Sequence, residues 1–227
     1  MQARLSVITP TRRRWPDIEQ QANVLLPQLT SPGDEWIIVV DRDEEGDSLY
    51  QRFWQQPTGT DKRIRSIWLS YESKNNVNCV NRARNLGSAV ACQDYLVEID
   101  DHDFVADGAI SLVREAFENL AADYVFGDVA RRVPTSTSND DVILEPQRWK
   151  YVPGMIAAGA VRPLGLRAMR AAVWRALGGW QVWPGGDLDF AIRVERCGFR
   201  IVHIPEILST ITVGESDSIM HACRHLA

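Results

Sequence analysis

One short segment of the sequence gathers carboxylates and an imidazole directly after the apolar residues 95–99, in the order Asp100, Asp101, His102 and Asp103. Clustered carboxylates repel one another, so a folded protein either exposes them to water or supplies a cation. Hard divalent ions such as Mn²⁺ and Mg²⁺ prefer oxygen ligands, accept an imidazole and can bridge to phosphate oxygens. The run therefore predicts a metal site that also holds a diphosphate. A solvated acidic turn that caps a helix starting near Asp107 is the alternative.

Two other apolar segments of strand length also end in polar residues. Residues 5–9 run into Thr9, Pro10 and Thr11, and residues 36–40 run into Asp41. In open parallel sheets, ligands bind beyond the carboxyl ends of the strands. We therefore expect these residues and the acidic run to meet at one edge of a sheet, around one ligand.

The elements that must position these residues follow an alternating pattern. Apolar runs of strand length alternate with amphipathic segments of helix length, which is typical of parallel β-α-β units. The expected strands are residues 5–9, 36–40, 64–69, 95–99 and 124–126. The expected helices are residues 18–29, 49–54, 80–90 and 109–120. The pattern predicts an α/β fold with a Rossmann-like, mostly parallel central sheet flanked by helices.

The second half of the chain is less regular. Residues 131–153 are expected to be irregular, with a polar loop over 135–141. Residues 166–177 are expected to form a helix that Gly178 and Gly179 end, and residues 187–197 a helix that Gly198 ends. A last strand is expected at residues 200–204.

Composition excludes several classes of protein. The net charge of −5 argues against a nucleic-acid-coating surface, because neutralising phosphates needs a concentrated basic face. The four cysteines follow no zinc-binding spacing, which favours reduced structural thiols. No apolar run approaches the ~20 residues that a membrane span needs, and the first residues lack the features of a signal peptide. These observations predict one soluble domain in the cytoplasm.

Several motifs along the chain resemble family 2 glycosyltransferases, which have the GT-A fold. The centre of that family is resembled by a stretch on one expected helix, Asn81-Arg82-Ala83-Arg84-Asn85-Leu86-Gly87. About ten residues later comes a strand that is closed by aspartates, as in the family. The opening strand with Thr9, Pro10 and Thr11, and the second strand ending in Asp41, also resemble it. Near the C-terminus the resemblance continues through Leu177-Gly178-Gly179-Trp180, Gly186-Asp187-Leu188-Asp189-Phe190, Arg193 and Gly198. It thus covers residues 5–208.

The resemblance implies a single domain over residues 1–227, with a donor half at about 1–103 and an acceptor half with the C-terminal tail at about 104–227. The implied donor is a nucleoside diphosphate sugar, linked to UDP, GDP or dTDP, and the implied cofactor is Mn²⁺ or Mg²⁺. Asp41 would accept a hydrogen bond from the base of the donor, in a pocket shaped by Thr9, Pro10 and Thr11. Arg84 would face the diphosphate, although an exposed helix arginine is the alternative. Asp100 and one or more of Asp101, His102 and Asp103 would hold the ribose and the metal.

The same resemblance makes Asp187 the general base. It would deprotonate a hydroxyl acceptor that attacks the anomeric carbon from the face opposite the diphosphate, with inversion. A plain helix-capping role is the alternative for Asp187, and Asp189 is its nearest rival. Trp180, Trp183 and Asp189 are expected at the acceptor, since aromatic faces stack on sugars; core packing is the alternative for Trp180.

The sequence departs from the family pattern at three places. Arg42-Asp43-Glu44 follows Asp41 where the family has another aspartate and then Gly-Ser, and Gly186 stands where a glutamate ordinarily precedes the base. The metal motif can be aligned as Asp100-Asp101-His102 or, one residue along, as Asp101-His102-Asp103. Both alignments stay open. The metal ligands are expected among Asp101, His102 and Asp103, without a choice between these residues.

Two other functions remain as alternatives. A sugar nucleotidyltransferase could use a similar sheet, but its first turn typically carries a glycine-rich phosphate loop. The first turn here has arginines and no glycine. A non-catalytic nucleotide-sugar-binding protein is the second alternative, favoured by the departures after Asp41 and at Gly186.

Overall fold

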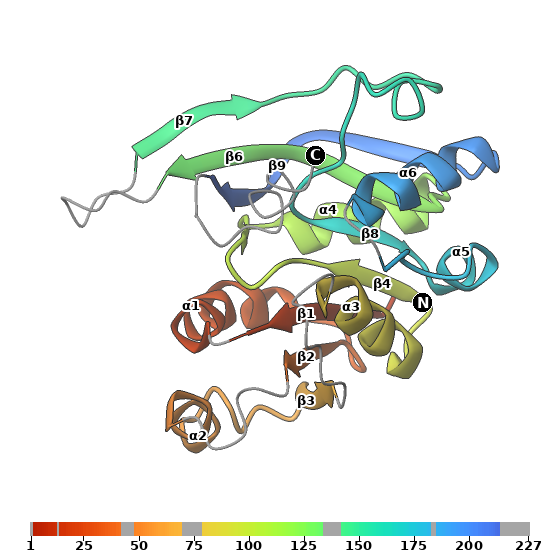
Figure 1. Ribbon diagram of the computed structural model, residues 1–227. Coiled ribbons are helices and arrows are strands. Elements are labelled where there is room, and N and C mark those ends of the chain that lie inside the picture. Colours follow the sequence, from red (N-terminus) through yellow and green to blue (C-terminus); the bar gives the residue numbers. More distant parts are fainter. Residues whose placement is uncertain are drawn as a thin grey trace.

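The computed structural model describes residues 2–12, 14–41, 48–69, 79–133, 142–182 and 185–213. One central sheet has the strand order β3-β2-β1-β4-β8-β6-β9-β5, and β7 pairs with the C-terminal part of β6 (Figure 1). Among the described residues, no helix is both long enough and apolar enough to cross a membrane.

The first half of the sheet is parallel, as the sequence predicts. Its strands are β1 (Leu5–Thr11), β2 (Glu35–Asp41), β3 (Ile64–Leu69) and β4 (Tyr95–Glu98). In β2, Trp36 and Ile38 enter the core on one face and Ile37 enters the core on the other, because successive side chains of a strand point in opposite directions. Both faces of this half are therefore buried, which explains the continuous apolar runs.

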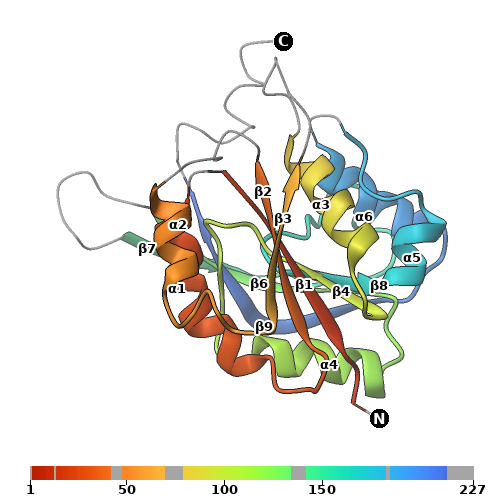
Figure 2. The same cartoon turned by 90° about the horizontal axis from the view of Figure 1, so that it is seen from below.

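Helices cover both faces of the sheet, as Figure 2 shows. One face carries α1 (Trp15–Leu25), α2 (Ser48–Gln55) and α4 (Ala109–Asn119). The other face carries α3 (Cys79–Val90), α5 (Ala171–Ala176) and α6 (Gly186–Arg196). The predicted fold class, an α/β fold with a mostly parallel central sheet flanked by helices, is confirmed.

The second half of the sheet corrects the sequence prediction. Residues 166–177 do not form one helix: they form the strand β8 (Arg167–Arg170) and then the short helix α5. β8 lies antiparallel between β4 and β6, where Ala168 and Met169 are fully buried. Packing in the centre of a sheet overrides the local helical pattern of such a short segment.

The strands beyond β8 are also longer than expected. β6 (Tyr124–Val133) and β9 (Ile201–Thr212) run parallel to each other well past the expected 124–126 and 200–204. β7 (Val142–Gln147) pairs with β6 inside the region that was expected to be irregular, and β5 (Phe104–Val105) pairs with β9. Mutual pairing supplies the backbone hydrogen bonds that the sequence pattern does not indicate. The loop expected at 135–141 lies outside the described residues.

Candidate active site

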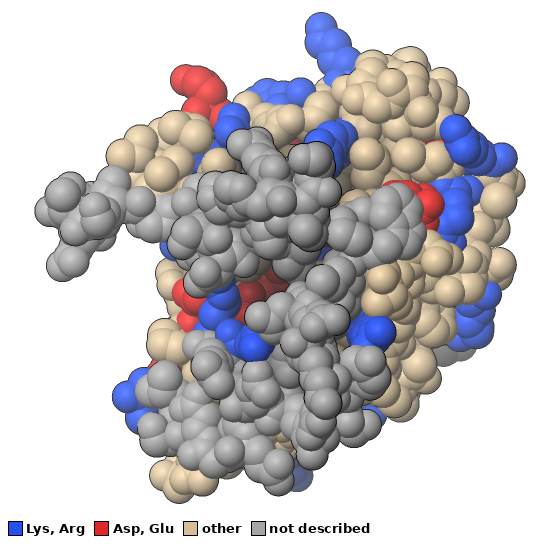
Figure 3. Space-filling model, in the orientation of Figure 1, with Lys and Arg blue, Asp and Glu red and all other residues tan. Residues whose placement is uncertain are grey.

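The polar ends of β1, β2 and β4 meet at one edge of the sheet. The three strands are neighbours in the order β2-β1-β4 and run parallel, so their carboxyl ends lie side by side. The backbone N–H of Arg12 donates to Oδ2 of Asp101 at 3.4 Å, which joins the first turn to the acidic run. Figure 3 shows acidic atoms inside a hollow, with basic atoms beside them. Asp41 ends β2 as predicted, and its side chain lies outside what the structure describes.

Thr9, Pro10 and Thr11 belong to β1, which runs past the expected residues 5–9, and all three are buried. The side chain of Thr9 is fully buried, and its Oγ1 accepts a hydrogen bond from Nε1 of Trp36 at 2.9 Å. Thr9 can therefore shape this edge only by fixing its neighbours.

Asp100, His102 and Asp103 form a cluster able to hold a cation. One potential ligand atom from each of the three lies within 4.8 Å of the others. Asp101 is not a member of this cluster but contacts it, because its Oδ1 lies 3.0 Å from Nδ1 of His102. That contact leaves Nε2 of His102 facing Asp103, at 3.9 Å from Oδ1. Compared with the expected set of Asp101, His102 and Asp103, the cluster keeps the last two and has Asp100 in place of Asp101.

The electrostatics of this cluster bear on how it would bind a divalent cation. Burial and the nearby charge of Asp100 raise the pKa of Asp103 to about 7. Although burial lowers it, the hydrogen bond to Asp101 and the charges of Asp103 and Asp100 raise the pKa of His102 to about 9. Both residues therefore hold their protons more tightly than usual, and a bound cation would have to displace these protons. Two carboxylates with one imidazole are nevertheless a donor set that Mn²⁺ or Mg²⁺ accepts. A carboxylate behind a ligating histidine commonly orients the ring, and Asp101 has this position relative to His102.

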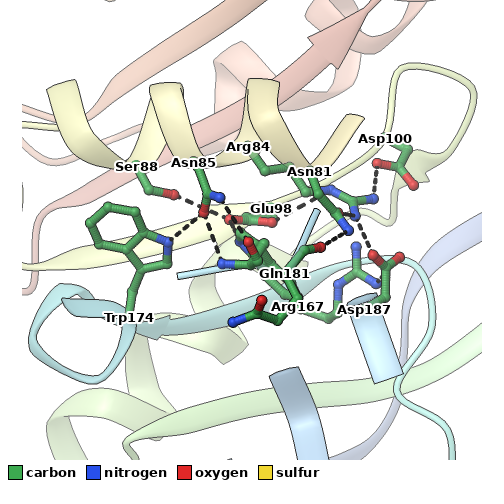
Figure 4. A network of polar contacts seen from close by, with 11 residues as sticks. Asn81, Arg84, Asn85, Ser88, Glu98, Asp100, Arg167, Trp174, Gln181 and Asp187 are labelled. Atoms are coloured by element: carbon green, nitrogen blue, oxygen red, sulfur yellow. Dashed lines mark hydrogen bonds and ion pairs between the residues drawn. The ribbon is translucent and has the colours of Figure 1, made fainter. Parts of the chain in front are cut away.

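Arg84 of α3 connects this cluster to the second half of the chain. Its side chain is 1% exposed; Nη2 donates to Oδ1 of Asp100 and Nη1 to Oδ1 of Asp187, both at 2.5 Å (Figure 4). Nε lies 3.6 Å from Oε2 of the fully buried Glu98. Burial raises the pKa of Glu98 to about 7. The described partners of Arg84 are thus carboxylates and Asn81, and its contact with a diphosphate stays a prediction.

Asp187 lies in the first turn of α6 and points into the same network. Its Oδ2 accepts from Nη1 of Arg167 at 3.2 Å. The N-cap of α6 is Gly185, and no side chain makes the capping hydrogen bond, so the contacts of Asp187 are with the two arginines. Although burial raises it, the charges of Arg84 and Arg167 lower the pKa of Asp187. Asp189 instead pairs with Arg193 of its own helix at 2.7 Å.

The structure corrects the role expected for Trp180. A stacking platform needs an exposed ring face, whereas Trp180 is 1% exposed and packs against Phe190. Its Nε1 donates to Oε1 of Glu98 at 2.6 Å, and its ring lies 5.6 Å from the guanidinium carbon of Arg84 and 5.4 Å from that of Arg167. Trp180 therefore supports the charged network from within the core. Trp183 lies outside the described residues.

Two amides of α3, Asn81 and Asn85, hold the backbone of the segment that leads into α6, and we call this pair the clamp. Asn85 receives the backbone N–H of Trp180 and donates to its carbonyl, both at 2.8 Å. Nδ2 of Asn81 donates to the carbonyl of Gln181 at 2.8 Å. These amides, Glu98 and Arg167 are site residues to which sequence reasoning gave no role. Glu98 can be recognised in the sequence, because a glutamate inside an apolar strand is unusual. Arg167 cannot, because the local pattern of residues 166–177 predicts a helix.

The clamp explains why residue 186 is glycine here. A Cβ at Gly186 would lie 2.3 Å from the carbonyl oxygen of Gln181 and 2.4 Å from Nδ2 of Asn81. We expect Gly186→Glu, which restores the usual family residue, to destabilise the protein by about 1–3 kcal/mol through overpacking and to lower turnover, because it displaces the start of α6. Thermal unfolding and donor hydrolysis measure the two effects.

Gly178→Ala is the matched control for that substitution. A Cβ at Gly178 meets no atom within 4 Å, so the variant experiences only the strain of its φ of +71°. It should lose stability but keep its turnover. A Gly186→Glu variant that is as stable as the wild type and more active would show that the site accommodates the glutamate.

The fold defines the class of the protein: it has a fold of the GT-A type. The model of the family described as glycosyl transferase family 2 matches residues 6–162 of the 227-residue chain. The chain therefore belongs to glycosyl transferase family 2, as the resemblance of its motifs predicted. No curated protein matches it.

Solved structures share the fold at low sequence identity. The mannosyltransferase PcManGT from Pyrobaculum calidifontis, in complex with GDP-Man and Mn²⁺, is similar with a TM-score of 0.67 and 17% identity, over 99% of this chain and 60% of that chain. TarS 1–349 from S. aureus has a TM-score of 0.64 and 14% identity, over 92% of this chain and 60% of that chain. TarS in complex with UDP-GlcNAc has a TM-score of 0.63 and 14% identity, over 93% of this chain and 59% of that chain. The chain thus spans about 60% of the length of the chains in these structures.

Proposed function

We propose that the protein is a metal-dependent, inverting glycosyltransferase that moves a sugar from a nucleoside diphosphate sugar to a hydroxyl acceptor. The observation that carries this proposal is the shared guanidinium of Arg84, which joins Asp100 of the cation cluster to Asp187. The buried guanidinium of Arg84 thereby holds a candidate metal ligand, Asp100, and a candidate base, Asp187, close together. The neighbours that hold GDP-Man with Mn²⁺ and UDP-GlcNAc support a nucleotide-sugar donor.

Donor binding is assigned to the carboxyl edge of the first four strands. Asp100, His102 and Asp103 would hold the Mn²⁺ or Mg²⁺. That cation would supply Lewis-acid stabilisation of the charge on the leaving diphosphate. Asp41 would contact the base of the donor, and residues up to about 103 would form the donor half of the domain. The cytoplasmic location stays a prediction from the sequence.

Asp187 would act as the general base. Its side chain is 40% exposed although its partner Arg84 is buried, so an acceptor can approach the carboxylate. The acceptor O–H bond breaks, the proton passes to Asp187, and the acceptor oxygen bonds to the anomeric carbon. The bond from that carbon to the nucleoside diphosphate breaks on the opposite face, which inverts the configuration.

Hydrolysis of donors tests the proposal without knowledge of the acceptor. We expect slow release of nucleoside diphosphate from at least one UDP-, GDP- or dTDP-sugar, dependent on added Mn²⁺. Asp103→Ala should abolish the Mn²⁺-dependent release of nucleoside diphosphate, because it removes a proposed metal ligand. Asp101→Ala should weaken the apparent Mn²⁺ affinity by about 10- to 10²-fold, as loss of a group behind a ligand does, and excess Mn²⁺ should restore its activity.

The exposed Asp107, just beyond the cluster, provides the matched control. Asp107→Ala should behave like the wild type. Full activity at ordinary Mn²⁺ in both the Asp101 and the Asp103 variants would refute a carboxylate metal site. Donor binding without any turnover would favour a non-catalytic binding protein.

A further inference from the structure

Arg167 is a buried charge that the sequence pattern does not indicate. It begins β8, and the strand register places it opposite Glu98 of β4 and opposite Phe126 of β6. Directly opposed residues of antiparallel strands have their side chains on the same face of the sheet. The side chain of Arg167 is 4% exposed, so the sheet holds this guanidinium beneath the site.

The contacts of Arg167 are directed at Asp187. Nη1 of Arg167 donates to Oδ2 at 3.2 Å, whereas Nη1 of Arg84 donates to Oδ1 at 2.5 Å. Each carboxylate oxygen therefore accepts from a different guanidinium, one from α3 and one from β8. Within the described chain, Arg84 also bonds Asp100, whereas the hydrogen bond to Asp187 is the one recorded for Arg167.

Trp180 keeps the two arginines in place. Its ring lies within 5.6 Å of both guanidinium carbons, a distance at which the ring face attracts a cation. A buried guanidinium is costly without a charged partner, so Arg167 is strongly held against the carboxylate. The arrangement fixes the carboxylate of Asp187 from two sides and leaves 40% of the side chain exposed.

We propose that Arg167 is a positioning residue for Asp187: it orients the carboxylate toward the acceptor and keeps it ionised between turnovers. This inference rests on the proposed role of Asp187 as general base. After the acceptor proton has passed to Asp187, the neighbouring positive charge favours its release to water, which returns the base to its ionised form.

Within the described residues, the charges that face Asp187 come from three elements. They are Arg84 from α3, Arg167 from β8, and Asp100, with the deeper Glu98, from the end of β4. Burial and the charge of Asp100 raise the pKa of Asp187, whereas the two arginines lower it. Removing Arg167 therefore raises this pKa and narrows the pH range in which the base is ionised.

Substitutions on β8 test this inference. We expect Arg167→Met to lower kcat for donor hydrolysis by about 10- to 10²-fold with little change in the donor KM, because the base is misplaced. The acid limb of the pH profile should move to higher pH. Arg167→Lys, which keeps the charge, should restore most of the activity. Arg170→Met on the same strand is the matched control, since Arg170 contacts Tyr95, Ala122 and Asp123 and should leave kcat unchanged.

A readout independent of activity separates this inference from the proposed function. The pKa of Asp187, followed by carboxyl ¹³C NMR with Asp187→Asn as the assignment, should rise in Arg167→Met. If that pKa rises while the wild type hydrolyses no donor, the contact between Arg167 and Asp187 is supported and the proposed glycosyltransferase function fails. If the wild type is active and Arg167→Met changes neither kcat nor the pKa, or changes kcat no more than Arg170→Met does, Arg167 has no positioning role. A raised KM at unchanged kcat would make Arg167 a donor contact and would overturn the inference.

Discussion

Asp187→Asn is expected to lower turnover by about 10²- to 10⁴-fold, the range typical of a lost general base. An amide has nearly the shape of the carboxylate, and its oxygen can still accept the hydrogen bond from Arg84. It cannot take the proton of the acceptor. Donor affinity should stay nearly unchanged, because the cation cluster lies on the other side of Arg84. Nucleoside diphosphate release and donor binding by calorimetry measure the two quantities.

Asp189→Asn is the comparison that this prediction needs. Asp189 lies two residues along the same helix, and its carboxylate is held by Arg193 at 2.7 Å. We expect a far smaller loss of turnover for it than for Asp187→Asn. Equal losses in the two variants, or unchanged turnover in Asp187→Asn, would contradict the assignment of Asp187 as the base. Thermal unfolding of both variants shows whether the fold is kept.

Replacing Arg84 should strongly destabilise the protein. Arg84→Met leaves Glu98, Asp100 and Asp187 with Arg167 as the remaining guanidinium of the network, and removing one partner of a buried ion pair costs about 3–5 kcal/mol. For a chain of this length the loss corresponds to a fall in Tm of roughly 6–20 °C. The variant should also lose turnover, since Asp100 and Asp187 lose their common partner. Thermal unfolding and donor hydrolysis below the lowered Tm check the two effects.

Arg114 offers a matched control on the other face of the sheet. It is a second buried arginine, 5% exposed, and its Nη2 pairs with Asp34 at 2.9 Å. Arg114→Met should lose comparable stability, yet keep its turnover at temperatures where it is folded. An Arg84→Met variant with the stability of the wild type would show that the carboxylate network contributes little to the fold.

The sequence predicts the first half of this molecule better than the second half. The apolar runs of β1 to β4 are buried on both faces, so their pattern shows where each strand ends and which polar residues share an edge. The adjacency of Thr11, Asp41 and Asp100 follows from that pattern alone. The cluster of Asp100, His102 and Asp103 does not, because the turn after β4 rotates Asp101 toward the first turn of the chain.

The second half of the site depends on long-range contacts that no local pattern contains. Residues 167–170 become a strand because β4 and β6 lie on either side of them. Trp180 becomes buried because Asn85 holds its backbone and Phe190 covers its ring. Motif resemblance still singles out Asp187, since it depends on the order of residues and not on their partners, and the role of Asp187 as the base stays a prediction.

The position of β8 also constrains how the chain can fold as it is synthesised. β4 and β6 are complete by residue 133, yet the strand that separates them ends at residue 170. Until that segment emerges, the facing edges of β4 and β6 have no partner, and open strand edges promote association between chains. Insertion of β8 between β4 and β6 brings Arg167 to its place in the same step. A nascent chain therefore joins the two halves of its sheet and forms this part of its site together, once residue 170 has emerged.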